Sequence, residues 1–229
     1  MKGLSCWNCY GTACSHVEFE GTDPDWMGEM AKQIITLSRQ YGSGGREIGE
    51  RIAKTLGYRY FDRELIRRIA ENEGFDLELV DRMSEGFFGR VSTLFSFANS
   101  AASKDEDSLP LADRVFLAQM RAIRQVADEG PCVVIGHSAD YFLADHPDLL
   151  SVFIHADWDS RVTRVMQRND LDKTAAIARI KKIDRKRAAF YESHTDRSWG
   201  ETDNYHLALS SSYFGIDQAV EIICSIASA

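Results

Sequence analysis

A glycine-rich stretch stands directly after the first short apolar run of the chain, and it constrains the fold more than any other feature. The run covers residues 32–38, and residues 38–49 read Ser-Arg-Gln-Tyr-Gly-Ser-Gly-Gly-Arg-Glu-Ile-Gly. Glycines let a chain turn tightly and expose successive backbone N–H groups. A helix predicted to begin near Gly45 adds its positive end, so the stretch predicts a seat for a phosphate. The alternative is a tight turn without a ligand, which the flanking Arg39 and Arg46 make less attractive.

The stretch departs from the usual phosphate-loop pattern. In place of a Gly-Lys-Ser/Thr ending the chain has Gly45-Arg46-Glu47, so both the lysine for the β/γ-phosphates and the hydroxyl for Mg²⁺ are missing. Arg46, or Arg39 from the other side, could replace the charge. No residue stands out as a replacement for the magnesium ligand.

Strand and helix signals alternate from residue 32 onward. Short apolar runs predict strands at 32–38, 58–61, 131–136, 150–155 and 205–210, and such runs are typical of parallel strands buried on both faces. Helices are predicted near 45–56, 62–72, 76–84, 111–128, 157–169, 172–192 and 215–227. This order predicts a three-layer α/β fold of the P-loop type, with a five-stranded parallel sheet and helices on both faces. Ligands gather beyond the carboxyl ends of such strands, here residues 38–46, 61–68, 136–140 and 155–161.

Composition narrows the partners and the compartment. The formal net charge is −8, which argues against nucleic-acid or anionic-membrane binding, so a phosphate ligand must be held by local charges. No segment approaches 18 consecutive apolar residues, and the N-terminus lacks the pattern of a signal peptide. Five scattered cysteines do not form a disulfide framework. A cytoplasmic protein is the expectation.

Two segments fall outside this alternating pattern. Residues 1–29 are predicted to be an N-terminal extension, either a flexible leader or the product of a misplaced start codon. The alternative is a small metal site, because the extension holds four soft ligands, Cys6, Cys9, Cys14 and His16. Residues 85–110, rich in Gly, Ser and Ala, are predicted to be a mobile excursion of the domain formed by residues 30–229.

Several motifs in this order resemble those of the cytidylate kinase-like family, a divergent branch of the nucleoside monophosphate kinases. The resemblance starts with the glycine-rich stretch and covers about residues 30–227. It continues through Tyr60-Phe61-Asp62-Arg63-Glu64, Gly130-Pro131-Cys132-Val133-Val134-Ile135-Gly136, Ala139-Asp140-Tyr141, Asp184-Arg185-Lys186-Arg187, Trp199-Gly200 and Asn204-Tyr205.

The resemblance implies two ligand sites. The donor phosphates would bind at residues 42–46, namely Gly42, Ser43, Gly44, Gly45 and Arg46, with Arg39 beside them. Acceptor contacts would come from Asp62, Arg68, His137 and Asp140. Asp62 and Asp140 could instead simply start helices, and Arg68 could be a solvated charge. Where the family's Gly-Arg-Asp stretch is expected, the chain reads Gly136-His137-Ser138-Ala139-Asp140, so a histidine replaces the arginine.

Residues 170–200 are predicted to form the helical lid that kinases of this class carry over the reaction. The segment holds the richest cationic run, from Arg179 to Arg187. On a helix, residues 181, 185 and 188 share one side and residues 182 and 186 another. By resemblance Arg185 and Arg187 are the catalytic lid arginines, with Asp184 orienting one of them. A solvated amphipathic face is the alternative.

The resemblance therefore implies phosphoryl transfer from ATP, with Mg²⁺, to a nucleoside monophosphate, CMP or dCMP being favoured. The catalytic residues would be Arg46, Arg185 and Arg187, and no protein metal ligand is assigned. The missing lysine and hydroxyl and the presence of His137 support an alternative, a nucleotide-binding module without kinase activity. A kinase for another small acceptor is a third hypothesis. Oligomeric state is left open.

Overall fold

The computed structural model describes residues 33–62, 67, 71, 74–75 and 111–229. The extension at 1–29 with its cysteines and His16, the helix predicted at 76–84, the excursion at 85–110 and Arg68 lie outside the described residues. Of the helix predicted at 62–72, only residues 62, 67 and 71 are described. The strands and the other helices can be compared with the prediction.

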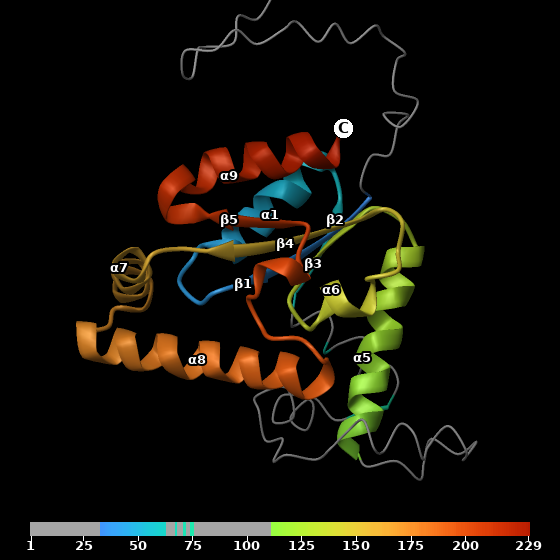
Figure 1. The fold of residues 1–229 in the computed structure, drawn as a ribbon, viewed down its shortest axis with the longest axis horizontal. Coiled ribbons are helices and arrows are strands. Elements are labelled where there is room, and N and C mark those ends of the chain that lie inside the picture. The colour runs from blue at the N-terminus through green and yellow to red at the C-terminus, as the bar shows by residue number, and fades with distance from the viewer. Residues whose placement is uncertain (1–32, 63–66, 68–70, 72–73, 76–110) are drawn as a thin grey trace, which may run out of the picture.

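Five parallel strands form one sheet in the order β2-β3-β1-β4-β5, with β1 in the centre (Figure 1). The strands are β1 (Ile34–Arg39), β2 (Arg59–Phe61), β3 (Cys132–Ile135), β4 (Leu149–His155) and β5 (Leu207–Ser210). Ile34 of β1 pairs with Cys132 on one side and with Leu149 on the other. β1, β3 and β4 are almost entirely buried, which explains their continuous apolar sequences. All five predicted strands are confirmed.

Helices cover both faces of this sheet. Helices α1 (Gly45–Leu56) and α9 (Ser211–Ala227) pack on one face, where Ile35 and Leu37 of β1 meet Ile48 and Ile223. Helices α5 (Leu111–Asp128) and α6 (Ala139–Phe142) pack on the other face, against Ile34 and its neighbours. The alternation of side chains along β1 thus feeds two separate cores. The predicted three-layer α/β architecture is confirmed.

Helices α7 (Trp158–Asn169) and α8 (Lys173–His194) have a small core of their own, formed by Val162, Val165, Ala176 and Ile180. Both begin at an aspartate, since Asp157 accepts the Ser160 N–H and Asp172 accepts the Ala175 N–H, each at 2.8 Å. α8 occupies most of the segment predicted to be the lid, and it lies on the side of the sheet away from α9 (Figure 1).

The last helix begins earlier than predicted, at Ser211 instead of residue 215. Helix α9 includes residues 211–214, but Gly215 has φ 76° and ψ 173° and interrupts the helical backbone. The predicted range of 215–227 therefore matches the part after the interruption. A short 3₁₀ helix, η3 (Thr202–Asn204), precedes β5.

His194 closes the end of α8 against α5. Its ring stacks on Phe116 with centroids 4.3 Å apart, and its Nδ1 lies 2.7 Å from the carbonyl oxygen of Phe190. Burial lowers the pKa of His194 below its ordinary value. The unfolded chain therefore binds a proton more readily than the folded chain.

This difference predicts that stability is lost as the pH falls below the ordinary histidine pKa of about 6.5. Between pH 7.5 and 5.5 we therefore expect His194 to contribute a fall in Tm. His194→Phe keeps the stacked ring but cannot titrate, so its Tm should depend less on pH. An identical pH dependence in the variant and the parent would contradict this assignment.

Candidate functional site

The glycine-rich loop connects the central strand β1 to α1. Gly42 and Gly44 have φ values of 85° and 81°, a left-handed conformation that glycine adopts without a steric penalty. A Cβ at Gly42 would lie 2.9 Å from the carbonyl oxygen of Arg161, and one at Gly44 would lie 2.5 Å from Cδ1 of Ile216. Both glycines are therefore required by the backbone conformation and by the close packing of α7 and α9 around the loop.

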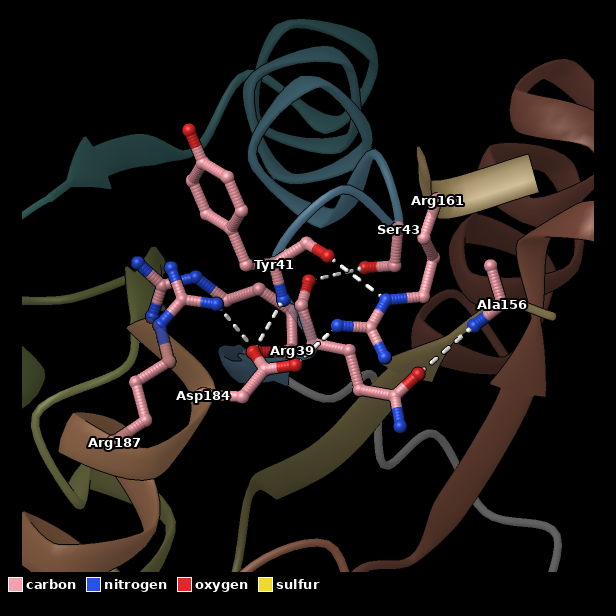
Figure 2. Close-up of polar contacts among 8 residues, drawn as sticks. Arg39, Tyr41, Ser43, Ala156, Arg161, Asp184 and Arg187 are labelled. Atoms are coloured by element: carbon pink, nitrogen blue, oxygen red, sulfur yellow. Dashed lines mark hydrogen bonds and ion pairs between the residues drawn. The ribbon is translucent and has the colours of Figure 1, made fainter. Parts of the chain in front are cut away.

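Tyr41 at the middle of the loop is held from both sides of its backbone. Its N–H donates to Asp184 Oδ1 at 2.8 Å, and its carbonyl oxygen accepts from Arg161 Nε at 2.8 Å. The Arg161 guanidinium also pairs with Asp184, which closes the arrangement (Figure 2). The Arg161 side chain is buried and that of Asp184 is partly buried, at 6% and 18% exposure. The pair fixes α7 and α8 to the loop. Asp184, which was predicted to orient a lid arginine, pairs with Arg161 of α7.

The remaining hydrogen bonds tie the loop to the neighbouring strand ends. Ser43 Oγ donates to the carbonyl oxygen of Gln40 at 2.9 Å, while Gln40 Oε1 accepts from the N–H of Ala156 at 3.2 Å (Figure 2). Ser211 Oγ donates to the carbonyl oxygen of Ser43 at 2.5 Å. The loop is thus a rigid turn, and no side chain caps the start of α1 that follows it. This leaves the first N–H groups of α1 as donors for an anion.

A cavity of about 740 Å³ opens beside the loop, between the ends of β1 and β3 and helix α8. We call it the cationic cavity, because five lysines and arginines line it and none of the described lining residues is an aspartate or a glutamate. The five cations are Arg39, Arg179, Lys182, Lys186 and Arg187. Since the whole chain carries a net charge of −8, this concentration of positive charge is local. It suits a ligand with phosphate groups.

The sequence matches the model of the cytidylate kinase-like family over residues 34–213. The chain belongs to this family. A comparison with curated proteins finds no match. Among solved structures, an uncharacterized protein from Eubacterium ventriosum ATCC 27560 is 23% identical with a TM-score of 0.65, and the match covers 86% of this chain and 98% of that one. That similarity supports the fold.

Two further structures resemble the chain more distantly. TT1252 from Thermus thermophilus is 20% identical with a TM-score of 0.46, over 84% of this chain and 94% of that one. Shikimate kinase from Bacteroides thetaiotaomicron is 14% identical with a TM-score of 0.44, over 84% of this chain and 97% of that one.

In this cytidylate kinase-like chain, the two predicted lid arginines have different surroundings. Arg187 lines the cationic cavity and donates from Nη1 to the carbonyl oxygen of Arg39 at 2.7 Å (Figure 2). Its guanidinium also lies 5.8 Å from the ring centre of Tyr41. Arg185 is exposed and is not among the residues that line the cavity. Arg187 lines the cavity together with Lys182 and Lys186 of the same helix, whereas Arg185 does not.

Arg46 joins the two predicted sites. Its guanidinium donates to Asp62 Oδ2 at 2.7 Å and to Glu50 Oε1 at 3.1 Å, and 54% of its side chain is exposed. Asp62, predicted to contact the acceptor, is therefore paired with an arginine predicted to contact the donor. Neither lines the cationic cavity. Their ligand-binding roles stay predictions.

The turn after β3 has an uncommon backbone. Gly136, His137 and Ser138 have φ values of 76°, 60° and 54° in succession, and positive values are strained for the two residues with side chains. His137 and Ser138 line the cationic cavity. Ser138 is 4% exposed, and its Oγ has no hydrogen-bond partner within the described part of the chain. The strained turn presents both residues to the cavity where an acceptor contact is predicted.

Asp140 is 3% exposed, and both of its carboxylate oxygens accept hydrogen bonds from the protein. The Tyr191 hydroxyl donates to Oδ2 at 2.8 Å, and the Ser38 hydroxyl donates to Oδ1 at 3.2 Å. Burial raises the pKa of Asp140, although these hydrogen bonds oppose the effect. The carboxylate thus ties α8 to the end of β1. Its predicted substrate contact stays a prediction.

A second cavity of about 910 Å³ lies at the other flank of the loop, bordered by Gly42, the first turns of α1, helix α7 and the start of α9. Its charges are mixed, since Glu47 pairs with Arg164 at 3.0 Å and Glu50 and Asp159 also line it.

In the part of the chain that is described, no group of three or more His, Cys, Asp or Glu side chains could hold a metal by itself. None of the described helices has the length and apolar character needed to cross a membrane.

Sequence reasoning missed several residues of this site. Arg179, Lys182 and Lys186 recur at spacings of three and four, so a helical projection centred on Lys186 would have placed them on one side of the helix. Arg161 lies in a predicted ligand segment, but nothing in the sequence pairs it with Asp184. Tyr191 has no local signal at all, because its partner Asp140 is 51 residues away.

The buried pair predicts a large difference between two aspartate substitutions. Asp184→Ala leaves the guanidinium of Arg161 buried without a carboxylate and should lower the free energy of unfolding by about 3–5 kcal/mol. Asp217→Ala is the matched control, because Asp217 pairs with Arg51 on the surface, with 83% and 43% of the side chains exposed. It should cost no more than ~1 kcal/mol. Urea unfolding of both variants checks this, and equal losses would contradict a special role for the buried pair.

Proposed function

We propose that this protein transfers a phosphoryl group from ATP to a nucleoside monophosphate, with CMP or dCMP as the expected acceptor. One observation carries the proposal. A glycine-rich loop at the carboxyl end of the central strand borders a cavity whose described lining contains five lysines and arginines and no carboxylate. Membership of the cytidylate kinase-like family supports the same reaction.

The loop separates the two cavities and can therefore bring two ligands together. Tyr41 borders the cationic cavity and Gly42 borders the second cavity. A nucleotide in the second cavity would direct its phosphates toward the loop and the start of α1. An acceptor in the cationic cavity would place its own phosphate beside them. Phosphoryl transfer depends mainly on such positioning and on positive charge around the moving group.

Magnesium would reach this site with the nucleotide. Mg²⁺ prefers oxygen ligands and is usually held by one or two carboxylates together with substrate phosphates. Glu47 fits this requirement, because it lies in the first turn of α1, borders the second cavity with Gly42 and is 46% exposed. Glu50 and Asp159 are further carboxylates of that cavity. Bound Mg²⁺ would neutralise charge on the phosphates.

Helix α8 would supply charge and exclude water on the acceptor side. Arg187 contacts both the backbone of Arg39 and the ring of Tyr41, so it is positioned before any ligand arrives. A preorganised guanidinium stabilises the charge that spreads over the transferred group at little reorganisation cost. Phe190, Tyr191 and Trp199 give the same cavity apolar surface.

One observation favours a second candidate, a kinase with a different phosphorylated acceptor. Asp62, the carboxylate that resemblance assigns to the acceptor, pairs with Arg46 and does not line the cationic cavity. The described lining offers many contacts to phosphate and few side chains that would select one base.

The reaction predicts ADP release that depends on the acceptor. With ATP and Mg²⁺, the right acceptor should give turnover of ~1–100 s⁻¹, the usual range for kinases. A coupled ADP assay against a panel of nucleoside and deoxynucleoside monophosphates measures it, with ATP alone as the control. Release confined to CMP or dCMP would support the first candidate. ATP binding without ADP release for any acceptor would instead indicate a nucleotide-binding module.

Arg187→Ala should lower kcat far more than it lowers the affinity for ATP. We expect a loss of about 10³-fold in kcat, as for other arginines that contact a phosphoryl group in flight. Lys181→Ala is the matched control, since Lys181 is an exposed cation of α8 that does not line the cavity. Steady-state kinetics and ATP titration of both variants test this. Equal losses of kcat and affinity in Arg187→Ala would exclude a role in the transition state.

A further inference from the structure

The side chain of Arg39 packs closely against two glycines, Gly45 and Gly136. Arg39 is the last residue of β1, and a Cβ at Gly45, the first residue of α1, would lie 2.6 Å from its Cβ. A Cβ at Gly136, after β3, would lie 2.0 Å from its Nη1. Any other residue at either position would displace the arginine. The Arg39 side chain therefore fits because Gly45 and Gly136 have no side chains at its two ends.

The guanidinium of Arg39 differs from those of Arg46, Arg161 and Arg164 because no carboxylate forms an ion pair with it, although the charge of Asp62 acts on it. Arg46 pairs with Asp62 and Glu50, Arg161 with Asp184, and Arg164 with Glu47. In the described residues, no hydrogen bond or ion pair involves the Arg39 guanidinium. Burial, together with the nearby Arg187, lowers the pKa of Arg39. Arg39 is partly buried at the cavity wall. A cation there without a hydrogen-bonded or ion-paired partner is destabilising, and an anion that enters the cavity would stabilise it.

The structure also fixes how the loop aligns with the usual pattern Gly-x₄-Gly-Lys-Ser/Thr. Gly44 has a left-handed backbone and immediately precedes the first helical residue, Gly45. If Gly44 is the second glycine of the pattern, Arg39 stands at the first glycine and Gly45 at the lysine. Relative to the usual pattern, this chain has the cation at position 39 and the glycine at position 45. Side chains at these two positions would occupy the same space.

We propose that Arg39 binds the terminal phosphate of the donor nucleotide in place of the missing lysine, reaching it from the strand over Gly45. This inference rests on the proposed function. In the reaction an oxygen of the acceptor bonds to the terminal phosphorus as the bond from that phosphorus to the bridging oxygen of ADP breaks. Arg39 neither gives nor takes a proton, and its charge stabilises the oxygens of the transferred group.

The exchange of residues can be reversed experimentally. Arg39→Met should lower kcat by about 10³-fold and weaken ATP binding by about ten-fold or more. Gly45→Lys alone should also be impaired, because its side chain collides with Arg39. In Arg39→Gly with Gly45→Lys, the lysine has the vacated space, and kcat should recover at least about ten-fold over Arg39→Gly. Arg51→Met is the control, an α1 arginine paired with Asp217 on the surface.

Thermal unfolding separates this role from a structural one. Removal of a partly buried charge that has no ion-pair partner should leave the Tm of Arg39→Met unchanged or raise it. A clear fall in Tm with unchanged ATP affinity would overturn the proposal, as would parental kinetics in Arg39→Met. If the parent protein transfers no phosphoryl group, the proposed function fails, and calorimetric ATP titration still tests Arg39. In that case lost affinity in Arg39→Met, restored by the double variant, supports the nucleotide contact, and unchanged affinity overturns it.

Discussion

The buried pair between Arg161 and Asp184 holds the candidate site together. It binds both the N–H and the carbonyl of Tyr41, and through them it joins α7 and α8 to the loop after the central strand. A charged pair in this position is expensive to bury, and it is tolerated because each partner also has a backbone hydrogen bond. The loop conformation, the wall of the cationic cavity and the direction of α8 all depend on it.

The placement of the acidic side chains explains how an acidic protein can have a strongly positive cavity. The acidic partners of Arg46, Arg161 and Arg164 all lie outside the cationic cavity. The cations inside it come from the end of β1 and from one side of α8. Their charges are close together because the fold holds them there, and phosphate is the ligand that such an arrangement suits. Overall net charge gives no indication of this local field.

Under the proposed function, the parts of the phosphoryl-transfer site have an unusual distribution. In the proposed site the loop backbone and the start of α1 would bind phosphate, the cation Arg39 would come from the strand, and the carboxylate Glu47 for a metal would come from the helix. Catalysis of this kind depends on where charges lie and less on which residue carries them. An arginine that enters from β1 can thus meet the same requirement as a lysine on α1.

The sequence by itself determined the strands, most helix limits and the position of the loop. These features depend on local periodicity, on glycine and on capping aspartates, which are all readable within a few residues. It also indicated that α8 carries cations. Only the tertiary structure decided which cations line the cavity. Arg187 rather than Arg185 faces the cavity because α8 is fixed by Asp184 and Tyr191, and their partners Arg161 and Asp140 lie 23 and 51 residues away. Likewise, the space that Gly45 and Gly136 leave for Arg39 exists only once β1, β3 and α1 are packed, because no local pattern encodes a side chain that passes between separate elements.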